Sequence, residues 1–437
     1  MKYLLAFALT ILSALPLRAE INIQEIETPA GFDVWLVEEH SIPFVALELR
    51  FKGGASLDLP GKRGATYLMT GLLEEGAGPY DARGFAEGAE AIAANFDYDT
   101  YDDSIAISAK FLTETSDQAL ALLRESLINP RFDDVDVDRV RQQVLTGLQG
   151  DAKDPDTIAS NRFSALAYGD HPYATAYEGT IESVQALTRE DLQAAHQGAM
   201  AKDRVYISAA GDITPDELAR LVDALLADLP ETGLPMPGHV DVAMPGGTIV
   251  VPFETPQSVA LFGHEGIAIE DPDYFAAYVM NVVLGGGGFE ARLMDEVREK
   301  RGLTYGVYSY LVSRDHAAIY AGRVASANDR IAEAIEVIRA EWAKMRDNGV
   351  SEDELRRAKT YLTGAYPLRF DGNNAIANIL VGMQMQGFPA DYVETRNDRV
   401  TAVTQDDVAR VAKRLLKPEA LTFVVVGQPE GLEATAN

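Results

Sequence analysis

Four consecutive glycines, Gly285, Gly286, Gly287 and Gly288, are the first residues whose type and spacing suggest ligand chemistry. The backbone amides of such a run can cradle a phosphate when a helix follows and a Lys-Ser or Lys-Thr pair completes the loop. No such pair follows here, and the next residues, FEARLMDEVREK, predict a helix over 289–300 that is rich in Arg and Glu. The run therefore disfavours a nucleotide site and predicts a glycine turn that leads into a helix.

Histidine and cysteine usage limits the metal and nucleophile chemistry of the chain. There is no cysteine, which excludes a disulfide, a thiolate metal site and a cysteine nucleophile. The histidines are all more than twenty residues apart, so no two of them have the spacing of a metal-binding pair on one helix. They are His40, His171, His196, His239, His264 and His316. A site assembled from distant histidines and carboxylates stays open.

Carboxylates are abundant, both locally and over the whole chain. Glu74 and Glu75 precede Gly76 and could act as general acid and base, although we interpret them as the solvated end of a helix. The chain has 67 Asp and Glu against 38 Lys and Arg, a formal charge of −29. This balance disfavours a nucleic-acid partner, which requires a dense cationic face. It favours solubility, and an acidic cavity would also attract cationic ligands.

Residues 1–19 have the pattern of a secretory signal peptide. Lys2 precedes an apolar run over residues 3–15, Pro16 interrupts the run, and Ala19 stands at a suitable cleavage position. The run is shorter than the roughly 20 residues that cross a bilayer, and no later segment predicts a membrane anchor. We predict an exported protein, most simply a periplasmic one, with no stable membrane insertion. An uncleaved anchor is the alternative.

An internal repeat organises the rest of the chain. The segment VQALTREDLQAAHQGAMAKDRVYISAAGD aligns without gaps on VTAVTQDDVARVAKRLLKPEALTFVVVGQ at an offset of 216 residues. In both copies a Thr and acidic residues start an amphipathic helix, and an apolar strand that ends in Gly follows a polar turn. The matching pairs include Thr188 with Thr404, Asp191 with Asp407, and Gly211 with Gly427. The repeat predicts two related halves.

A proline- and glycine-rich segment at residues 230–247 separates the two copies and is predicted to be a linker. It leaves one domain at 20–229 and another at 248–437. Each half combines strands with amphipathic helices, the clearest being strands at 45–51 and 105–111 and helices at 116–129, 136–149 and 328–347. Strands and helices do not alternate strictly, which favours an α+β fold with an antiparallel sheet packed against helices in each domain.

The segment REKRGLTY resembles the second-half signature of the pitrilysin/insulysin-like metallopeptidases, the family that includes mitochondrial processing peptidase. In that family an arginine on a helix is followed seven residues later by a tyrosine at the start of a strand. Arg298 and Tyr305 have this spacing, with a strand predicted over 304–311. The resemblance covers essentially the whole mature chain and implies two α+β domains that form half of a clam-shell chamber. It also implies that the glycine run forms a wall of the substrate chamber, with a simple packing turn as the alternative.

Family members bind zinc through an inverted motif, H-x-x-E-H, in their first half, where two histidines are ligands and the glutamate is the general base. In the matching segment the motif positions are Tyr67, Thr70 and Gly71, and the third ligand position falls at Thr146 and Gly147. None of these residues can perform the roles required. The resemblance therefore implies no metal and no cofactor in this chain, with zinc expected in a partner subunit.

Arg298 and Tyr305 can donate hydrogen bonds to the oxyanion that develops during peptide hydrolysis, or hold the substrate backbone. The resemblance implies a non-catalytic, substrate-binding subunit of a two-chain zinc peptidase, inactive alone. Its partner would be a homologous subunit that bears zinc and H-x-x-E-H, and its ligand a peptide substrate. The alternative is a purely structural or peptide-binding scaffold with no catalytic contribution. A self-sufficient hydrolase is disfavoured because no nucleophile elbow or carboxylate dyad is recognisable.

Overall fold

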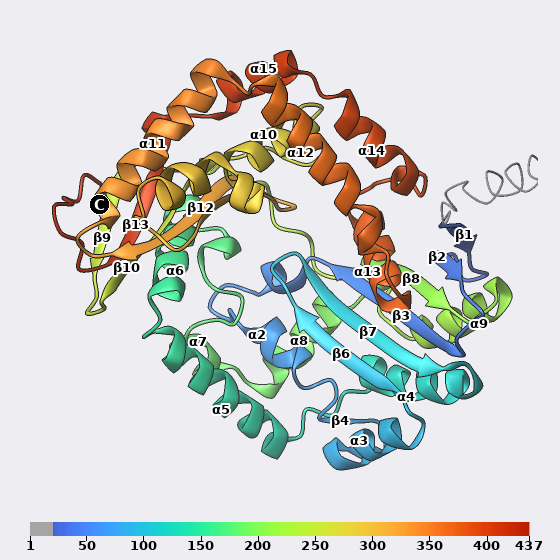
Figure 1. Cartoon of the computed structure of the whole chain (residues 1–437). Helices are drawn as coiled ribbons and strands as arrows, with labels where there is room; N and C mark the ends of the chain where they lie inside the picture. The colour runs from blue at the N-terminus through green and yellow to red at the C-terminus, as the bar shows by residue number, and fades with distance from the viewer. Residues whose placement is uncertain (1–20, 437) are drawn as a thin grey trace, which may run out of the picture.

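Two open β-sheets, each with helices packed against it, make up the computed structural model, which describes residues 21–436 (Figure 1). Each sheet belongs to one half of the chain, and the expected α+β class is confirmed. The signal peptide predicted at residues 1–19 lies outside the described residues. Among the described helices, none combines the length and the apolar character needed to cross a membrane.

The first sheet has six strands in the order β1-β2-β8-β3-β7-β6. β3 and β7 pair antiparallel from Phe44 opposite Leu112 to Lys52 opposite Ser104. Their apolar side chains form a core with the helices on one face of the sheet. The strands are β1 (Gln24–Glu27), β2 (Asp33–Glu38), β3 (Phe44–Lys52), β6 (Asn95–Thr100), β7 (Ser104–Leu112) and β8 (Val205–Gly211), and the helices of this half are α2 (Ala65–Thr70), α3 (Ala82–Ala91), α4 (Ser116–Ile128), α5 (Asp134–Asp151), α7 (Ile181–Ala186), α8 (Arg189–Ala199) and α9 (Pro215–Leu226). A small hairpin pairs β4 (Gly76–Ala77) with β5 (Tyr80–Asp81).

The second sheet has five strands in the order β11-β12-β10-β13-β9. Trp342 and Phe423 are fully buried in the core between this sheet and its helices. The strands are β9 (Gly247–Pro252), β10 (Gln257–Glu265), β11 (Val307–Ser313), β12 (Ala318–Ala327) and β13 (Thr422–Gly427), and the helices are α10 (Tyr274–Asn281), α11 (Ile331–Asn348), α12 (Glu352–Ala365), α14 (Tyr392–Ala402) and α15 (Gln405–Leu415). Between the halves, residues 230–246 form neither helix nor strand.

Neither sheet is purely antiparallel, which corrects one detail of the prediction. β2 pairs parallel with β8 in the first sheet, and β13 pairs parallel with β9 in the second. Parallel neighbours require a long crossover between them. Several helices lie between β2 and β8 in the first half, and between β9 and β13 in the second. The sequence of a single strand does not specify a partner that is so far along the chain.

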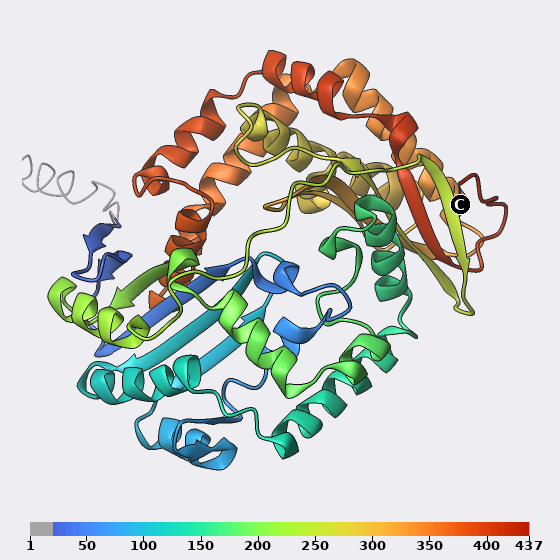
Figure 2. The same cartoon turned by 180° about the vertical axis from the view of Figure 1, so that it is seen from behind.

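The two halves exchange one helix each. α6 (Pro155–Tyr168), which belongs to the first half, packs against the second sheet through Phe163 and Ala167, next to Val424. α13 (Asn373–Met385), from the second half, packs against the first sheet through Ala377 and Leu380. Figures 1 and 2 show α6 beside β10 and α13 across β3 and β8. Through α6 and α13, each half of the chain therefore packs directly against the sheet of the other half.

The internal repeat is confirmed at the level of single hydrogen bonds. Thr188 starts α8 and Thr404 starts α15, each with a capping box completed by an Asp three residues later. The strands that follow end at Gly211 and Gly427, whose φ angles are 143° and 153°. A Cβ atom at either position would lie 2.3 Å from a neighbouring oxygen, so both copies require glycine.

Candidate functional site

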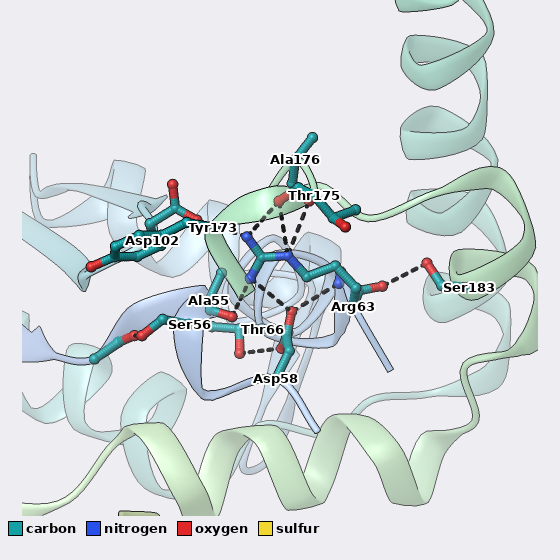
Figure 3. A network of polar contacts seen from close by, with 12 residues as sticks. Ala55, Ser56, Asp58, Arg63, Thr66, Asp102, Tyr173, Thr175, Ala176 and Ser183 are labelled. Atoms are coloured by element: carbon teal, nitrogen blue, oxygen red, sulfur yellow. Dashed lines mark hydrogen bonds and ion pairs between the residues drawn. The ribbon is translucent and has the colours of Figure 1, made fainter. Parts of the chain in front are cut away.

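The segment matched to the zinc motif starts at a firmly anchored helix, α2. Arg63 precedes it and donates from Nη2 to Asp102 Oδ1 at 2.7 Å, and the Arg63 side chain is only 11% exposed. Asp58 accepts hydrogen bonds from the backbone amide and the hydroxyl of Thr66, at 2.8 and 2.7 Å, and so satisfies the first turn of α2. Ser183 Oγ donates to the Arg63 carbonyl at 2.7 Å. This network, drawn in Figure 3, holds the start of α2 in place.

The positions matched to the zinc ligands lie together around one cavity of about 640 Å³. Tyr67, Thr70 and Gly71 line it from α2, and Gly147 of α5 lines it at the position matched to the third ligand. The Thr70 hydroxyl donates to the Thr66 carbonyl at 2.9 Å, within its own helix. These positions supply no imidazole or carboxylate and do not fit a zinc ion. In the part of the chain that the structure describes, no three His, Asp or Glu side chains are grouped to hold a metal.

This cavity adjoins a second one of about 700 Å³, and together they form a cleft that we call the acidic cleft. The two cavities share the lining residues Leu148, Asp151, Tyr177 and Glu178. The second cavity also reaches the other half of the molecule, where Leu261, Arg314 and Arg323 line it. The fold therefore places the segment matched to the zinc motif beside a cleft bounded by both halves.

Negative charge predominates in the acidic cleft. Its two arginines are already paired, Arg314 with Asp102 at 2.8 Å and Arg323 with Asp156 at 2.7 Å. Glu75 is held by Arg139 at 3.0 Å, from outside the cleft. The carboxylates that line the cleft are Glu74, Glu75, Asp99, Asp102, Asp151, Asp156, Glu178 and Glu182. Most of them have no cation beside them in the part of the chain that the structure describes, so a cationic ligand would be attracted.

Glu178 and Tyr177 lie where the two cavities meet. Burial raises the pKa of the Glu178 carboxyl, and the negative charges of Asp151 and Asp102 add to this effect. Burial, followed by the charge of Glu178, raises the pKa of Tyr177 to about 12, so its hydroxyl remains protonated at neutral pH. The Tyr177 ring lies 5.8 Å from the Tyr67 ring. The centre of the cleft thus combines a hydrogen-bond donor with a crowded carboxyl group.

Arg298 and Tyr305 lie together on the surface, with a third residue that the sequence did not single out. The Arg298 guanidinium carbon lies 5.2 Å from the centre of the Tyr305 ring and 4.8 Å from that of Phe289. Phe289 is 71% exposed and Tyr305 is 90% exposed. We call these three residues the Arg298 stack. None of them lines the acidic cleft.

The elements around the Arg298 stack differ from the prediction. The strand predicted from residue 304 begins later, at Val307, and Tyr305 lies in the preceding turn. Thr304 anchors this turn, because its hydroxyl donates to the Ala325 carbonyl of β12 at 2.6 Å and accepts from the Gly306 amide at 3.0 Å. The helix predicted over 289–300 is a 3-10 turn, Gly288–Glu290, followed by a π-helix, Met294–Glu299. The backbone around Tyr305 is therefore held while its side chain is free to contact another molecule.

The glycine run is largely helical rather than a turn. Gly285 and Gly286 complete a π-helix, Val282–Gly286, that extends α10. A Cβ atom on Gly285 would lie 2.3 Å from Ser309 Oγ of β11, so this glycine permits close packing. Gly287 and Gly288 line a surface cavity of about 620 Å³ together with Phe289 and side chains of α12. Packing thus accounts for Gly285, and contact with a substrate stays a prediction for the rest of the run.

Comparison with known proteins identifies the family. The insulinase (peptidase family M16) model matches residues 33–181, and the model described as the peptidase M16 inactive domain matches residues 186–362. A crystal structure described as a peptidase M16 inactive domain from Pseudomonas fluorescens is 30% identical, with a TM-score of 0.87, and the match covers 94% of this chain and 100% of that one. The chain belongs to peptidase family M16.

Relatives in family M16 carry two kinds of name. A Helicobacter pylori protein named non-peptidase homolog YmxG is 26% identical, over 97% of this chain and 98% of its own length. The uncharacterized zinc protease SCO5738 of Streptomyces coelicolor is 25% identical, over 83% of this chain and 80% of its own length. The second half of this chain thus matches the model described as the M16 inactive domain, and in the first half positions 67, 70 and 71 carry Tyr, Thr and Gly in place of the H-x-x-E-H residues.

Proposed function

We propose that this M16 chain is the non-catalytic, substrate-binding subunit of a two-chain zinc peptidase. A homologous partner would carry H-x-x-E-H and the zinc ion, and this chain would present Arg298 and Tyr305 to the partner's active site. The observation that supports this most strongly is the Arg298 stack, in which a half-buried guanidinium, paired with Glu299 at 3.4 Å, lies beside an exposed phenol although the positions of the zinc ligands are replaced.

The chemistry of the stack suits the role. Attack on a peptide carbonyl develops negative charge on its oxygen, and preorganised donors lower the energy of that state. The Tyr305 hydroxyl is a single donor on a rigid ring, whereas the Arg298 guanidinium offers a planar set of donors and a permanent charge. Contact with two aromatic faces limits the movement of the guanidinium. The pair would therefore meet a substrate carbonyl with little loss of conformational freedom.

The acidic cleft would bind part of the peptide. Its carboxylates that lack a paired cation favour peptide segments that carry Lys or Arg. Because the cleft is lined by residues of both halves, it favours an extended peptide over a compact ligand. We place this activity in the periplasm because residues 1–19 have the pattern of a signal peptide.

Mixing this chain with a zinc-bearing M16 partner tests the proposal. Zinc content and peptide cleavage are measured for each purified chain and for the equimolar complex. We expect no stoichiometric zinc and no cleavage from this chain alone, and cleavage by the complex well above that of the partner alone. One tightly held zinc per chain with chelator-sensitive cleavage by this chain alone would contradict the proposal.

The second candidate function is a structural or peptide-binding scaffold. The name of the Helicobacter pylori relative, a non-peptidase homologue, favours it. A scaffold would bind peptides in the acidic cleft without changing the cleavage rate of any partner, so the same mixing experiment separates the two candidates.

A further inference from the structure

A cavity of about 320 Å³ lies in the second half, away from the acidic cleft, between α10, α13, α14 and the 3-10 turn Pro367–Arg369. We call it the arginine-tyrosine cavity because Arg369 and Arg396 line it together with several tyrosines. None of the described Asp and Glu residues lines it, although acidic residues outnumber basic ones by 67 to 38 in the chain. The cavity is thus a positively charged site in a negatively charged protein.

Arg396 is the most informative of its residues. It is 5% exposed, and the structure describes two other buried arginines, Arg63 and Arg204. Arg63 is paired with Asp102, and Arg204 with Asp203. Arg396 has no carboxylate within ion-pair distance among the described residues, and its hydrogen bonds go to neutral oxygens such as the Leu362 carbonyl at 2.8 Å. Buried charges are normally paired, so this guanidinium lacks a counter-ion.

The walls of the cavity are aromatic and offer neutral donors. Arg396 lies 4.5 Å from the centre of the Tyr366 ring, and the Phe388 and Tyr392 rings stack at 4.0 Å. Burial raises the pKa of Tyr274 and of Tyr366 to about 12, so both phenols keep their protons at neutral pH. An entering anion would therefore meet two guanidinium groups and protonated phenols.

We propose that the arginine-tyrosine cavity binds a small carboxylate that carries an aromatic group. The carboxylate supplies the counter-ion that Arg396 lacks, and the ring packs against the stacked aromatic walls. The volume is at the lower end of ligand pockets, which limits the ligand to about the size of one aromatic amino acid. Such a carboxylate is found on free aromatic acids and at the C-terminus of a peptide.

The position of the cavity gives binding a second effect. Asn378 lines it from α13, and its side-chain oxygen accepts a hydrogen bond from Arg50 of the first sheet at 2.7 Å. α13 is the helix through which the second half packs on the first sheet. A ligand bridging α13 and α14 would therefore also stabilise the contact between the two halves.

Titration calorimetry and thermal unfolding of the purified chain test the proposal, with N-acetyl-L-phenylalanine as the probe. N-acetyl-L-phenylalaninamide keeps the ring without the charge, and acetate keeps the charge without the ring. We expect saturable binding of the acid, at least about tenfold tighter than that of the amide or of acetate, and a rise in the unfolding temperature. The tripeptide Gly-Gly-Phe and its amide distinguish the two sources, because binding of the tripeptide points to a peptide terminus and its failure to bind points to a free acid.

Two variants connect binding to this cavity. Arg369→Gln removes the exposed guanidinium and should weaken binding of the acid about tenfold. Gly382→Leu fills the cavity from α13, where an added Cβ meets no atom within 4 Å, and should abolish binding while the helix remains intact. Arg83→Gln and Gly150→Leu are matched controls on distant helices. Equal affinity for the acid and the amide, no binding of the acid, or unchanged binding in both cavity variants would overturn the proposal.

Discussion

The imidazole of His264 illustrates how one buried residue can make the whole fold sensitive to pH. The Trp342 indole can only donate a hydrogen bond, so His264 Nε2 accepts it at 3.0 Å. The proton is then on Nδ1, which donates to the Glu265 carbonyl at 2.6 Å. Burial lowers the pKa of His264 to about 4. A second proton would face the indole N–H and has no acceptor.

We expect the free energy of unfolding to fall when the pH is lowered from 6.5, the ordinary value for histidine, to about 4. In this window the unfolded chain binds a proton at His264 that the folded chain does not, so stability is complete above the window and is lost toward its lower end. The difference between the two pKa values corresponds to about 3 kcal/mol.

Urea unfolding at several pH values measures this effect. His264→Gln should flatten the dependence on pH over the window, whereas the control His239→Gln, on an exposed residue, should leave it unchanged. An equal slope in wild type and His264→Gln would show that the ring does not carry the effect.

At the scale of elements, the two copies of the repeat are held by the same local device. α8 and α15 each start with a threonine whose side chain accepts from the amide three residues on, while the aspartate there accepts from the threonine amide. This capping box satisfies amides that have no partner within the helix. Equivalent geometry predicts equivalent energies.

Thr188→Ala and Thr404→Ala should each lower the free energy of unfolding by about 1 kcal/mol, as the loss of a helix cap does. Thr360→Ala, in the interior of α12, is the control and should change it by less than about 0.5 kcal/mol. Chemical denaturation provides the measurement. A large loss at one cap and none at the other would show that the two copies are not equivalent.

Patterns local in the sequence were sufficient to predict many elements. The alternation over 45–51 and 105–111 corresponds to β3 and β7, and the helical periodicity over 116–129 and 136–149 corresponds to α4 and α5. The exchange of α6 and α13 was not predictable, because an amphipathic face does not specify which sheet it covers. The parallel strand pairs were missed because the pattern of a strand does not specify which distant strand lies beside it.

Within the candidate site, only the residues that belong to a sequence motif could be predicted. The spacing of Arg298 and Tyr305 led to two residues that do lie in contact, although Tyr305 precedes its strand. Phe289 was missed because only the folded chain brings its ring to Arg298; an exposed aromatic residue after the glycine run was the available signal. The π-helices were missed because tertiary packing, such as that of Gly285 on Ser309, determines them.

At the scale of the whole molecule, the excess of acidic residues has a definite place. Carboxylates from the first half line the acidic cleft, and among residues 21–436 the only cations lining it are two arginines of the second half that are already paired with them. The field of such a cleft extends into solvent and is screened by salt over about 8 Å at 0.15 M ionic strength. Peptide binding should therefore depend on both charge and salt.

A lysine-rich peptide should bind more tightly than a glutamate-rich peptide of equal length, and its affinity should fall as salt is raised to about 0.15 M. Fluorescence anisotropy of labelled peptides measures both effects. Glu178→Gln should weaken binding of the lysine-rich peptide, whereas Glu87→Gln, on an exposed helix outside the cleft, should not. Binding that is independent of salt and of peptide charge would leave solubility as the sole role of the acidic residues.

The central claim is that Arg298 and Tyr305 act on the zinc site of a partner, and the turnover of the reconstituted two-chain complex with Tyr305→Phe tests it most directly. The substitution removes one hydroxyl and keeps the ring against Arg298, so assembly, checked by size-exclusion chromatography, should be unchanged. Loss of one oxyanion donor lowers turnover by about 100- to 1000-fold, and we expect a decrease in this range. Arg298→Lys, which keeps the charge without the planar donors, should also lower turnover. Near-normal turnover in both fully assembled variants would contradict the claim and leave the chain as a scaffold.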